Sequence, residues 1–280
     1  MNIQFPVQES VNARYSVRNY SDRPIDAETR QAIEDFISSM DNPFASQVKF
    51  HYLDQNAMQG QEKLGTYGVI KGAKQYIGTT IKSEPEALEA VGYELEAVML
   101  YLANQGIGTC WLGGTFDRAG FASAMNVGED EIFPVITPYG YPAAKKHVKE
   151  VMMRKLIKAD QRKDWKELFF YNDFNTALTT AQAGELEFAL EMVRLAPSAS
   201  NKQPWRVVLT DTGCHFYEYK EPGYSDRFPY DIQRIDMGIA ACHFDLAVKE
   251  KNIAGHFVTD NKPDIIWPAN IEYVFSWVRD

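Results

Sequence analysis

Hydrophobic residues follow helical spacing in several segments of the chain and fill two of them almost completely. Residues 84–106 place Leu95, Val98 and Leu102 on one face and read as a long, largely buried helix that ends at a glycine. A second such helix begins at Asp236 and continues into a strand. Shorter helices are expected at 26–40, after a possible Asp26 cap, and at 186–196. Strands are expected at 49–53, 73–81, 135–142, 205–211, 214–219 and 271–278.

This order of elements occurs twice along the chain. The segment from Gly92 aligns without a gap with the segment from Gly238, at an offset of 146 residues. In this alignment Leu100 corresponds to Leu246, and the aromatic Trp111 corresponds to the aromatic Phe257. Two buried helices can look alike by chance, but helix, loop, strand, strand, long helix and strand follow in the same order in both parts.

The repeat predicts a tandem duplication with its junction near residues 165–180. We therefore expect a first half at 1–170 and a shorter second half at 171–280, which share one core.

Composition and charge narrow the class of protein. The chain has 280 residues, of which 45% are hydrophobic, so it can bury a large core. Its formal net charge of -9 argues against nucleic acid and anionic membranes as partners. No apolar run approaches a membrane span, and the first ten residues lack the pattern of a signal peptide. Three scattered cysteines suggest a reducing compartment without a zinc site, so the expected location is the cytoplasm.

One stretch near the N-terminus, "RYSVRNY", has the chemistry of a phosphate receptor. Arg14, Ser16 and Arg18 alternate with other residues, so an extended backbone would point all three side chains the same way. Two guanidinium groups and a hydroxyl bind a phosphate well, because arginine donates bidentate, charge-assisted hydrogen bonds. The same pattern is also common on solvated surfaces.

A second stretch, "APSASNKQPW", combines rigidity with many polar side chains. Pro197 and Pro204 stiffen it, and Trp205 would anchor its end in the core. Such a loop suits the edge of a planar heteroaromatic ring, although a polar helix-to-strand turn is the simpler reading. The donors and acceptors are Ser198, Ser200, Asn201 and Gln203.

Together with "GIGTCWLGGTF" and "PVITPYGYPAAKK", these motifs resemble the nitroreductase family of FMN-dependent oxidoreductases. The resemblance spans nearly the whole chain. It implies an α+β, nitroreductase-like fold with mixed, mainly antiparallel sheet. Family members are intertwined homodimers, in which one subunit holds the FMN phosphate and the Pro-Ser-Asn loop of the other approaches the flavin ring.

The two motifs are split between the halves of this chain. In the first half "MDNPFASQVKF" stands in place of the ring loop, and in the second half "FNTALTT" stands in place of the phosphate motif. Each half thus keeps what the other has lost. The resemblance is to a tandem-repeat branch of the family, a fused pseudo-dimer with one FMN per chain, for which a monomer is sufficient.

By resemblance, further residues complete the cofactor site. Arg162 and Lys163 would add positive charge at the phosphate, with plain surface charge as the alternative. Gly113 and Gly114 would let the backbone approach the flavin N5 edge, and Lys71 would contact the ring. The full set of expected cofactor-binding residues is Arg14, Tyr15, Ser16, Arg18, Lys71, Gly113, Gly114, Arg162, Lys163, Pro197, Ser198, Ala199, Ser200, Asn201 and Gln203.

The activity implied is an FMN-dependent NAD(P)H oxidoreductase. Hydride would pass from NAD(P)H to the flavin and on to a nitroaromatic, a quinone or a similar small-molecule acceptor in a ping-pong cycle. No side-chain nucleophile and no metal are needed, and His51 and His243 read as structural. The aromatic segment 224–231 is either a lid or, more simply, a packed surface turn. The alternatives are a flavin store or sensor with little turnover, and a relative that has lost its cofactor.

Overall fold

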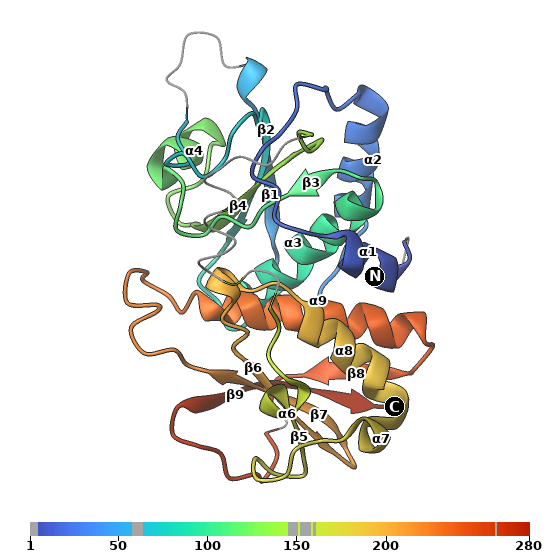
Figure 1. Cartoon of the computed structure of the whole chain (residues 1–280). Coiled ribbons are helices and arrows are strands. Elements are labelled where there is room, and N and C mark those ends of the chain that lie inside the picture. Colours follow the sequence, from blue (N-terminus) through green and yellow to red (C-terminus); the bar gives the residue numbers. More distant parts are fainter. Residues whose placement is uncertain (1–4, 58–63, 145–150, 152–157, 159–160, 261) are drawn as a thin grey trace.

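The computed structural model describes residues 5–57, 64–144, 151, 158, 161–260 and 262–280. It contains two sheets, with two long helices between them (Figure 1). The first sheet is antiparallel throughout, in the order β1-β2-β4-β3. Its strands are β1 (Lys49–Asp54), β2 (Gln75–Ile81), β4 (Ile132–Gly140) and β3 (Gly108–Thr109).

The second sheet has the order β5-β6-β7-β9-β8. The pair β5–β6 is parallel, and the other three pairs are antiparallel. The strands are β5 (Phe169–Tyr171), β6 (Trp205–Thr210), β7 (Gly213–Tyr219), β9 (Ile271–Arg279) and β8 (Gly255–Val258). The expected mixed, mainly antiparallel α+β architecture is therefore confirmed.

Helices pack on both sheets. The long ones in the middle of Figure 1 are α3 (Ala87–Asn104) and α9 (Gln233–Glu250). The others are α1 (Val7–Ala13), α2 (Ala27–Ser38), α4 (Arg118–Ala124), α6 (Trp165–Leu168), α7 (Thr180–Ala183) and α8 (Glu187–Leu195), with 3-10 turns η1 (Gln55–Ala57), η2 (Gly184–Leu186) and η3 (Ala199–Asn201). Asp26 caps α2 as expected, because its carboxylate accepts from the Thr29 N–H.

The two long helices meet at the aligned glycines. A Cβ atom on Gly92 would lie 2.0 Å from the Ile235 carbonyl oxygen, and one on Gly238 would lie 1.9 Å from the Glu89 carbonyl oxygen. Glu89 and Ile235 are themselves 146 residues apart, the offset of the repeat. Each helix therefore makes the same contact on its partner, as at a two-fold interface.

One hydrophobic core contains residues of both halves. Leu95 of α3 and Phe244 of α9 belong to the same buried cluster, which extends to Trp277 in β9. Cys110, Cys214 and Cys242 are buried, and none of them forms a disulfide. In the part of the chain that the structure describes, no helix has the length and apolar composition needed to cross a membrane.

The junction between the halves contains elements that the sequence did not indicate. The proposed boundary at 170/171 falls inside β5, and all three residues of β5 pair with β6 in the second sheet. The segment from α6 onward thus lies with the second sheet. The division into 1–170 and 171–280 remains a proposal, as does the duplication behind it.

Candidate functional site

The N-terminal arginine segment runs beside β3 as extended backbone. Ser16 forms a parallel bridge with Thr109, and the Val17 N–H donates to the Thr109 carbonyl over 2.8 Å. The Lys71 N–H donates to the Arg18 carbonyl over 2.9 Å. These bonds hold the segment as extended backbone beside β3 and Lys71.

The two arginines of this segment are buried but incompletely bonded. Arg18 is 7% exposed, and its Nε and Nη1 atoms have no hydrogen-bond partner among the described residues. The side chain of Arg14 is also 7% exposed; its Nη1 likewise finds no partner there, and its Nε lies 3.7 Å from Glu96 Oε1. Buried charged donors are costly unless something accepts from them, so this arrangement suits an anion.

Two other expected residues lie on the same segment or against it. Lys71 is exposed, and its main chain lies between Arg18 and Tyr20, with the Tyr20 N–H donating to its carbonyl over 2.9 Å. Tyr15 is 39% exposed. Backbone pairing therefore brings Lys71 to the phosphate segment.

The glycine pair after β3 faces the beginning of α9. A Cβ on Gly113 would lie 2.9 Å from Ile232 Cδ1, and one on Gly114 would lie 3.5 Å from Phe228 Cζ. The Gly113 carbonyl accepts from Arg118 Nη2. This loop of the first half therefore packs against the segment of the second half that leads into α9.

The loop after α8, residues 196–205, is called the ring loop here for the role that the resemblance implies. Its backbone is unusual. Ser200, Asn201 and Gln203 have φ values of +50°, +57° and +50°, in the left-handed region that few non-glycine residues adopt. The Gln203 N–H donates to Ser198 Oγ over 2.8 Å. Such local strain persists only where surrounding contacts hold it, and it is frequent at ligand sites.

One of those contacts comes from Asp236, which the sequence did not single out. The Ala199 N–H donates to Asp236 Oδ1 over 2.9 Å, whereas Oδ2 is buried without a hydrogen-bond partner among the described residues. Burial raises the pKa of Asp236 to about 8, although the Ala199 bond opposes this. The carboxyl is thus suited to holding the loop as a neutral acid.

Arg162 and Lys163 lie with the ring loop. Arg162 Nε donates to the Leu195 carbonyl over 3.2 Å, and its Nη1 donates to Asn201 Oδ1 over 3.3 Å. The Lys163 N–H donates to Gln203 Oε1 over 2.8 Å. Burial, together with nearby cationic Arg206, lowers the pKa of Lys163. Both residues therefore support the loop.

Two helices join these groups into one region. Glu96 of α3 lies beside Arg14 and accepts a hydrogen bond from Trp111 Nε1 over 2.7 Å. Trp111 is two residues before Gly113 in the chain. At the start of α9, Ile232 meets the glycine pair and Asp236 holds the ring loop. The structure thus connects residues 14–18, the glycine pair and the loop at 198–203 through α3 and the start of α9.

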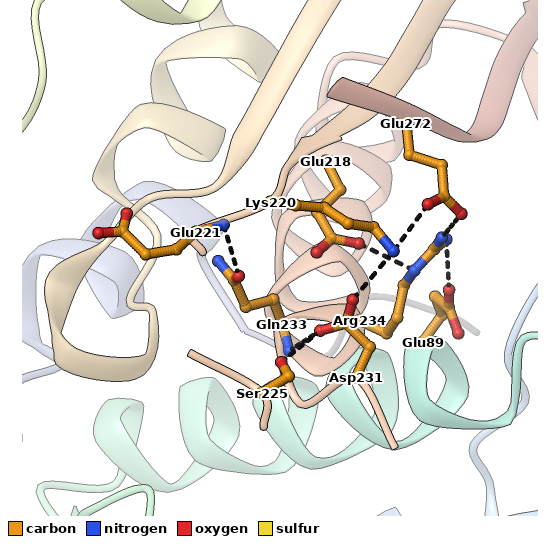
Figure 2. A network of polar contacts seen from close by, with 9 residues as sticks. All are labelled: Glu89, Glu218, Lys220, Glu221, Ser225, Asp231, Gln233, Arg234 and Glu272. Carbon is orange, nitrogen blue, oxygen red and sulfur yellow. Dashed lines mark hydrogen bonds and ion pairs between the residues drawn. The ribbon is translucent and has the colours of Figure 1, made fainter. Parts of the chain in front are cut away.

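A polar network fixes the segment before α9 (Figure 2). Asp231 Oδ1 accepts from Ser225 Oγ over 2.6 Å and from the Gln233 N–H over 3.1 Å. Lys220 lies 3.2 Å from Asp231 Oδ2. Arg234 points between three carboxylates, those of Glu89, Glu218 and Glu272. The network therefore holds residues 220–234 against the first half.

A pocket of 280 Å³ opens beside this network, at the start of α3. Its lining carries four carboxyl groups, and Arg234 is the single cation among them. The lining residues are Glu84, Pro85, Glu86, Ala87, Leu88, Glu89, Asp231, Arg234 and Val274. Burial raises the pKa of Glu218, the partner of Arg234, to about 8, although the charge of Arg234 opposes this. Because four carboxyl groups would repel a negatively charged ligand, the pocket is a poor receptor for a phosphate.

Comparisons with known proteins agree with the fold. A family model described as "Putative TM nitroreductase" matches residues 6–248. The crystal structure of a "putative nitroreductase" from Thermotoga maritima MSB8 is similar over 100% of this chain and 96% of its own, with a TM-score of 0.62 and 19% identity. A search of curated proteins finds no match.

Shorter structures match about half of the chain. A nitroreductase with bound FMN from Bacteroides fragilis NCTC 9343 covers 51% of this chain and 92% of its own, with 19% identity and a TM-score of 0.41. An FMN-dependent nitroreductase from Clostridium difficile R20291 covers 50% and 89%, with 15% identity and a TM-score of 0.39.

Proposed function

The chain belongs to this nitroreductase family and has its fold, and from that premise we propose that it is an FMN-dependent NAD(P)H oxidoreductase with one cofactor site between its halves. The phosphate would bind at Arg14, Ser16 and Arg18 of the first half. The ring would lie between the glycine pair and the ring loop of the second half.

The observation that carries this proposal is the pair of buried, incompletely bonded arginines. Three guanidinium nitrogens of Arg14 and Arg18 are buried without a hydrogen-bond partner among the described residues. A phosphate monoester brings up to two negative charges and three acceptor oxygens. The donor set therefore fits a flavin phosphate in charge and in number.

The chain's residues around the ring would position it and exclude water. Gly113 and Gly114 carry no side chain, so the ring could approach the backbone of this loop, where Ile232 and Phe228 are the nearest side chains. The ring loop is held by Asp236 and Arg162, and the side-chain amides of Asn201 and Gln203 bond to residues 158–163, which would fix the loop beside the ring. FMN, when bound, accepts a hydride at N5 and delivers electrons to an acceptor.

Nothing in the site requires a nucleophile from the protein. We propose NADH or NADPH as the donor, and an electron-poor small molecule such as a nitroaromatic or a quinone as the acceptor, in alternation at one face of the ring. Because both halves lie within one chain, a monomer can hold the site. The three buried thiols fit a cytoplasmic protein.

The first test is a comparison of Arg18→Ala with the unchanged protein. We expect FMN to bind about a hundredfold more weakly to the variant, because charge-assisted hydrogen bonds are lost. Riboflavin, which lacks the phosphate, should bind both proteins about equally. Arg30→Ala is the matched control, since Arg30 pairs with Asp54 on the surface.

Anaerobic addition of NADH or NADPH to the FMN-loaded protein then separates an enzyme from a store. Bleaching of the flavin absorbance supports an oxidoreductase. Bound FMN that neither nucleotide reduces would instead support storage or sensing.

A further inference from the structure

We propose that His243 is a positioning residue for the phosphate site. Because His243 shares a proton with Glu96, the Glu96 carboxylate does not form a close ion pair with Arg14. The inference rests on the proposed function, because it assigns a cofactor phosphate to Arg14. It also makes the second half a contributor to the phosphate end of the site, where the sequence indicated only the first half.

The contacts around Glu96 carry the inference. Its side chain is fully buried, and Oε2 accepts from Trp111 Nε1 over 2.7 Å. Its other oxygen, Oε1, has two neighbours. His243 Nε2 lies at 3.0 Å, a hydrogen-bond distance, whereas Arg14 Nε lies at 3.7 Å, which is too long for one.

The protonation of His243 follows from its other nitrogen. Nδ1 lies 3.0 Å from the Met192 carbonyl oxygen, which can only accept, so Nδ1 carries a hydrogen. The contact between Nε2 and Glu96 Oε1 then needs a second hydrogen between these two atoms. The histidine and the carboxyl together are therefore neutral, in either arrangement of that hydrogen.

Neutralising Glu96 leaves the arginine charges for the ligand. Without the proton shared with His243, the carboxylate would offset one of the two positive charges of Arg14 and Arg18. With it, the segment keeps a charge that matches a phosphate of nearly two negative charges. If Glu96 bonds His243 and leaves Arg14 for the ligand, Arg14 should lie too far from Glu96 for a hydrogen bond and should have an unbonded nitrogen. Both are observed, at Arg14 Nε and Arg14 Nη1.

A purely structural role for His243 is the alternative. His243 is fully buried and connects α9 to α8 through Met192, so its loss could simply loosen the helices. The two roles differ in one respect. Loosened packing weakens every flavin, whereas an uncompensated Glu96 weakens only a ligand that carries the phosphate.

The experiment measures the dissociation constants of FMN and riboflavin for four proteins. These are the unchanged chain, His243→Gln, Glu96→Gln and the double variant. We expect His243→Gln to weaken FMN about tenfold and riboflavin less than about twofold. Glu96→Gln should keep the preference for FMN, since an amide can still accept from Trp111 and donate to His243. The double variant should restore the preference lost in His243→Gln.

The control is His215→Gln, at another buried histidine, which bonds Ser276 in the second sheet. This control should leave both constants unchanged. Equal weakening of both flavins by His243→Gln, or no rescue in the double variant, would overturn the inference. If His243→Gln does not fold, Glu96→Gln decides, because a tenfold loss of its FMN preference is incompatible with the inference. An unchanged chain that binds neither flavin would contradict the proposed function itself.

Discussion

The loop that follows α2 and the loop that follows α8 occupy corresponding places in the two halves. Each connects a helix to the first strand that follows it, β1 or β6, and each lies near the start of a long helix. Ser46 Oγ donates to the Pro85 carbonyl just before α3, and the Ala199 N–H donates to Asp236 in α9. Ala45 even adopts the left-handed conformation, with φ of +55°.

What fills the two loops differs. In the first half Phe44 is 4% exposed, and its ring centroid lies 5.3 Å from that of Phe275 and 6.3 Å from that of Tyr93. In the second half the loop carries polar residues, with Asn201 bonded to Arg162, and is held by the buried carboxyl of Asp236. At the position of Asp236, the aligned residue of α3 is Ala90.

The comparison shows that a two-fold contact between the long helices can coexist with two loops of different character. The contact between the long helices is the same on both sides, because both glycines are needed for the close approach. The two loops are not under that constraint. One loop is closed by an aromatic ring, and the other carries polar side chains and left-handed residues of the kind that is frequent at ligand sites.

The largest expected effect comes from Phe44→Ala. Removing this ring leaves a cavity among aromatic side chains, so we expect the free energy of unfolding to fall by about 4 kcal/mol. Urea unfolding measures it. Phe228→Ala, in the half-buried segment facing Gly114, should cost less than about 1 kcal/mol. FMN affinity should be unchanged in Phe44→Ala; a clear loss would mean that the two loops are not functionally distinct.

A smaller effect is expected from Gly92→Ala and Gly238→Ala. Each added methyl group meets a backbone carbonyl at about 2 Å, which should cost about 2 kcal/mol after the better helix propensity of alanine. The symmetric contact predicts similar losses for both. Gly65→Ala is the control, because nothing lies within 4 Å of its added Cβ. Strongly unequal losses would break the two-fold description.

A third expected effect, spread gradually over a pH range, is the pH dependence that Asp236 contributes. The pKa of this group rises from 3.8 to about 8 on burial. Between those values the folded chain binds a proton that the unfolded chain releases, so stability contributed by the group declines as pH rises toward 8. Asp236→Asn should therefore lose less stability than the unchanged chain between pH 5 and pH 8.

Unfolding at several pH values, with the exposed Asp226→Asn as control, measures this difference. Parallel stability curves for Asp236→Asn and the unchanged chain would contradict the neutral, buried carboxyl.

Much of this architecture is predictable from local patterns. The long helices follow from continuous hydrophobic spacing, and the aligned glycines follow from the repeat. The family and the fold are confirmed by the family model and by the similar structure from Thermotoga maritima. The structure has the segment around Ser16 as extended backbone, which is the condition under which the alternation in "RYSVRNY" would align its side chains.

Other features depend on how the helices dock. The three residues of β5 are too few to give a strand signal, and their partner β6 lies far along the chain. Glu96 and His243 are 147 positions apart and meet only when α3 packs on α9. Both helices bury other ionisable side chains, such as Glu94 and Asp245, so no local signal marks Glu96 and His243 as a pair.

The measurement that tests the central claim most directly is a calorimetric titration of the flavin-free chain with FMN. One complete site built from complementary halves predicts one FMN bound per chain. It also predicts that the acidic pocket at the start of α3 takes up no second molecule. Two FMN molecules per chain would contradict the division of the motifs between the halves, and no binding would contradict the cofactor site as a whole.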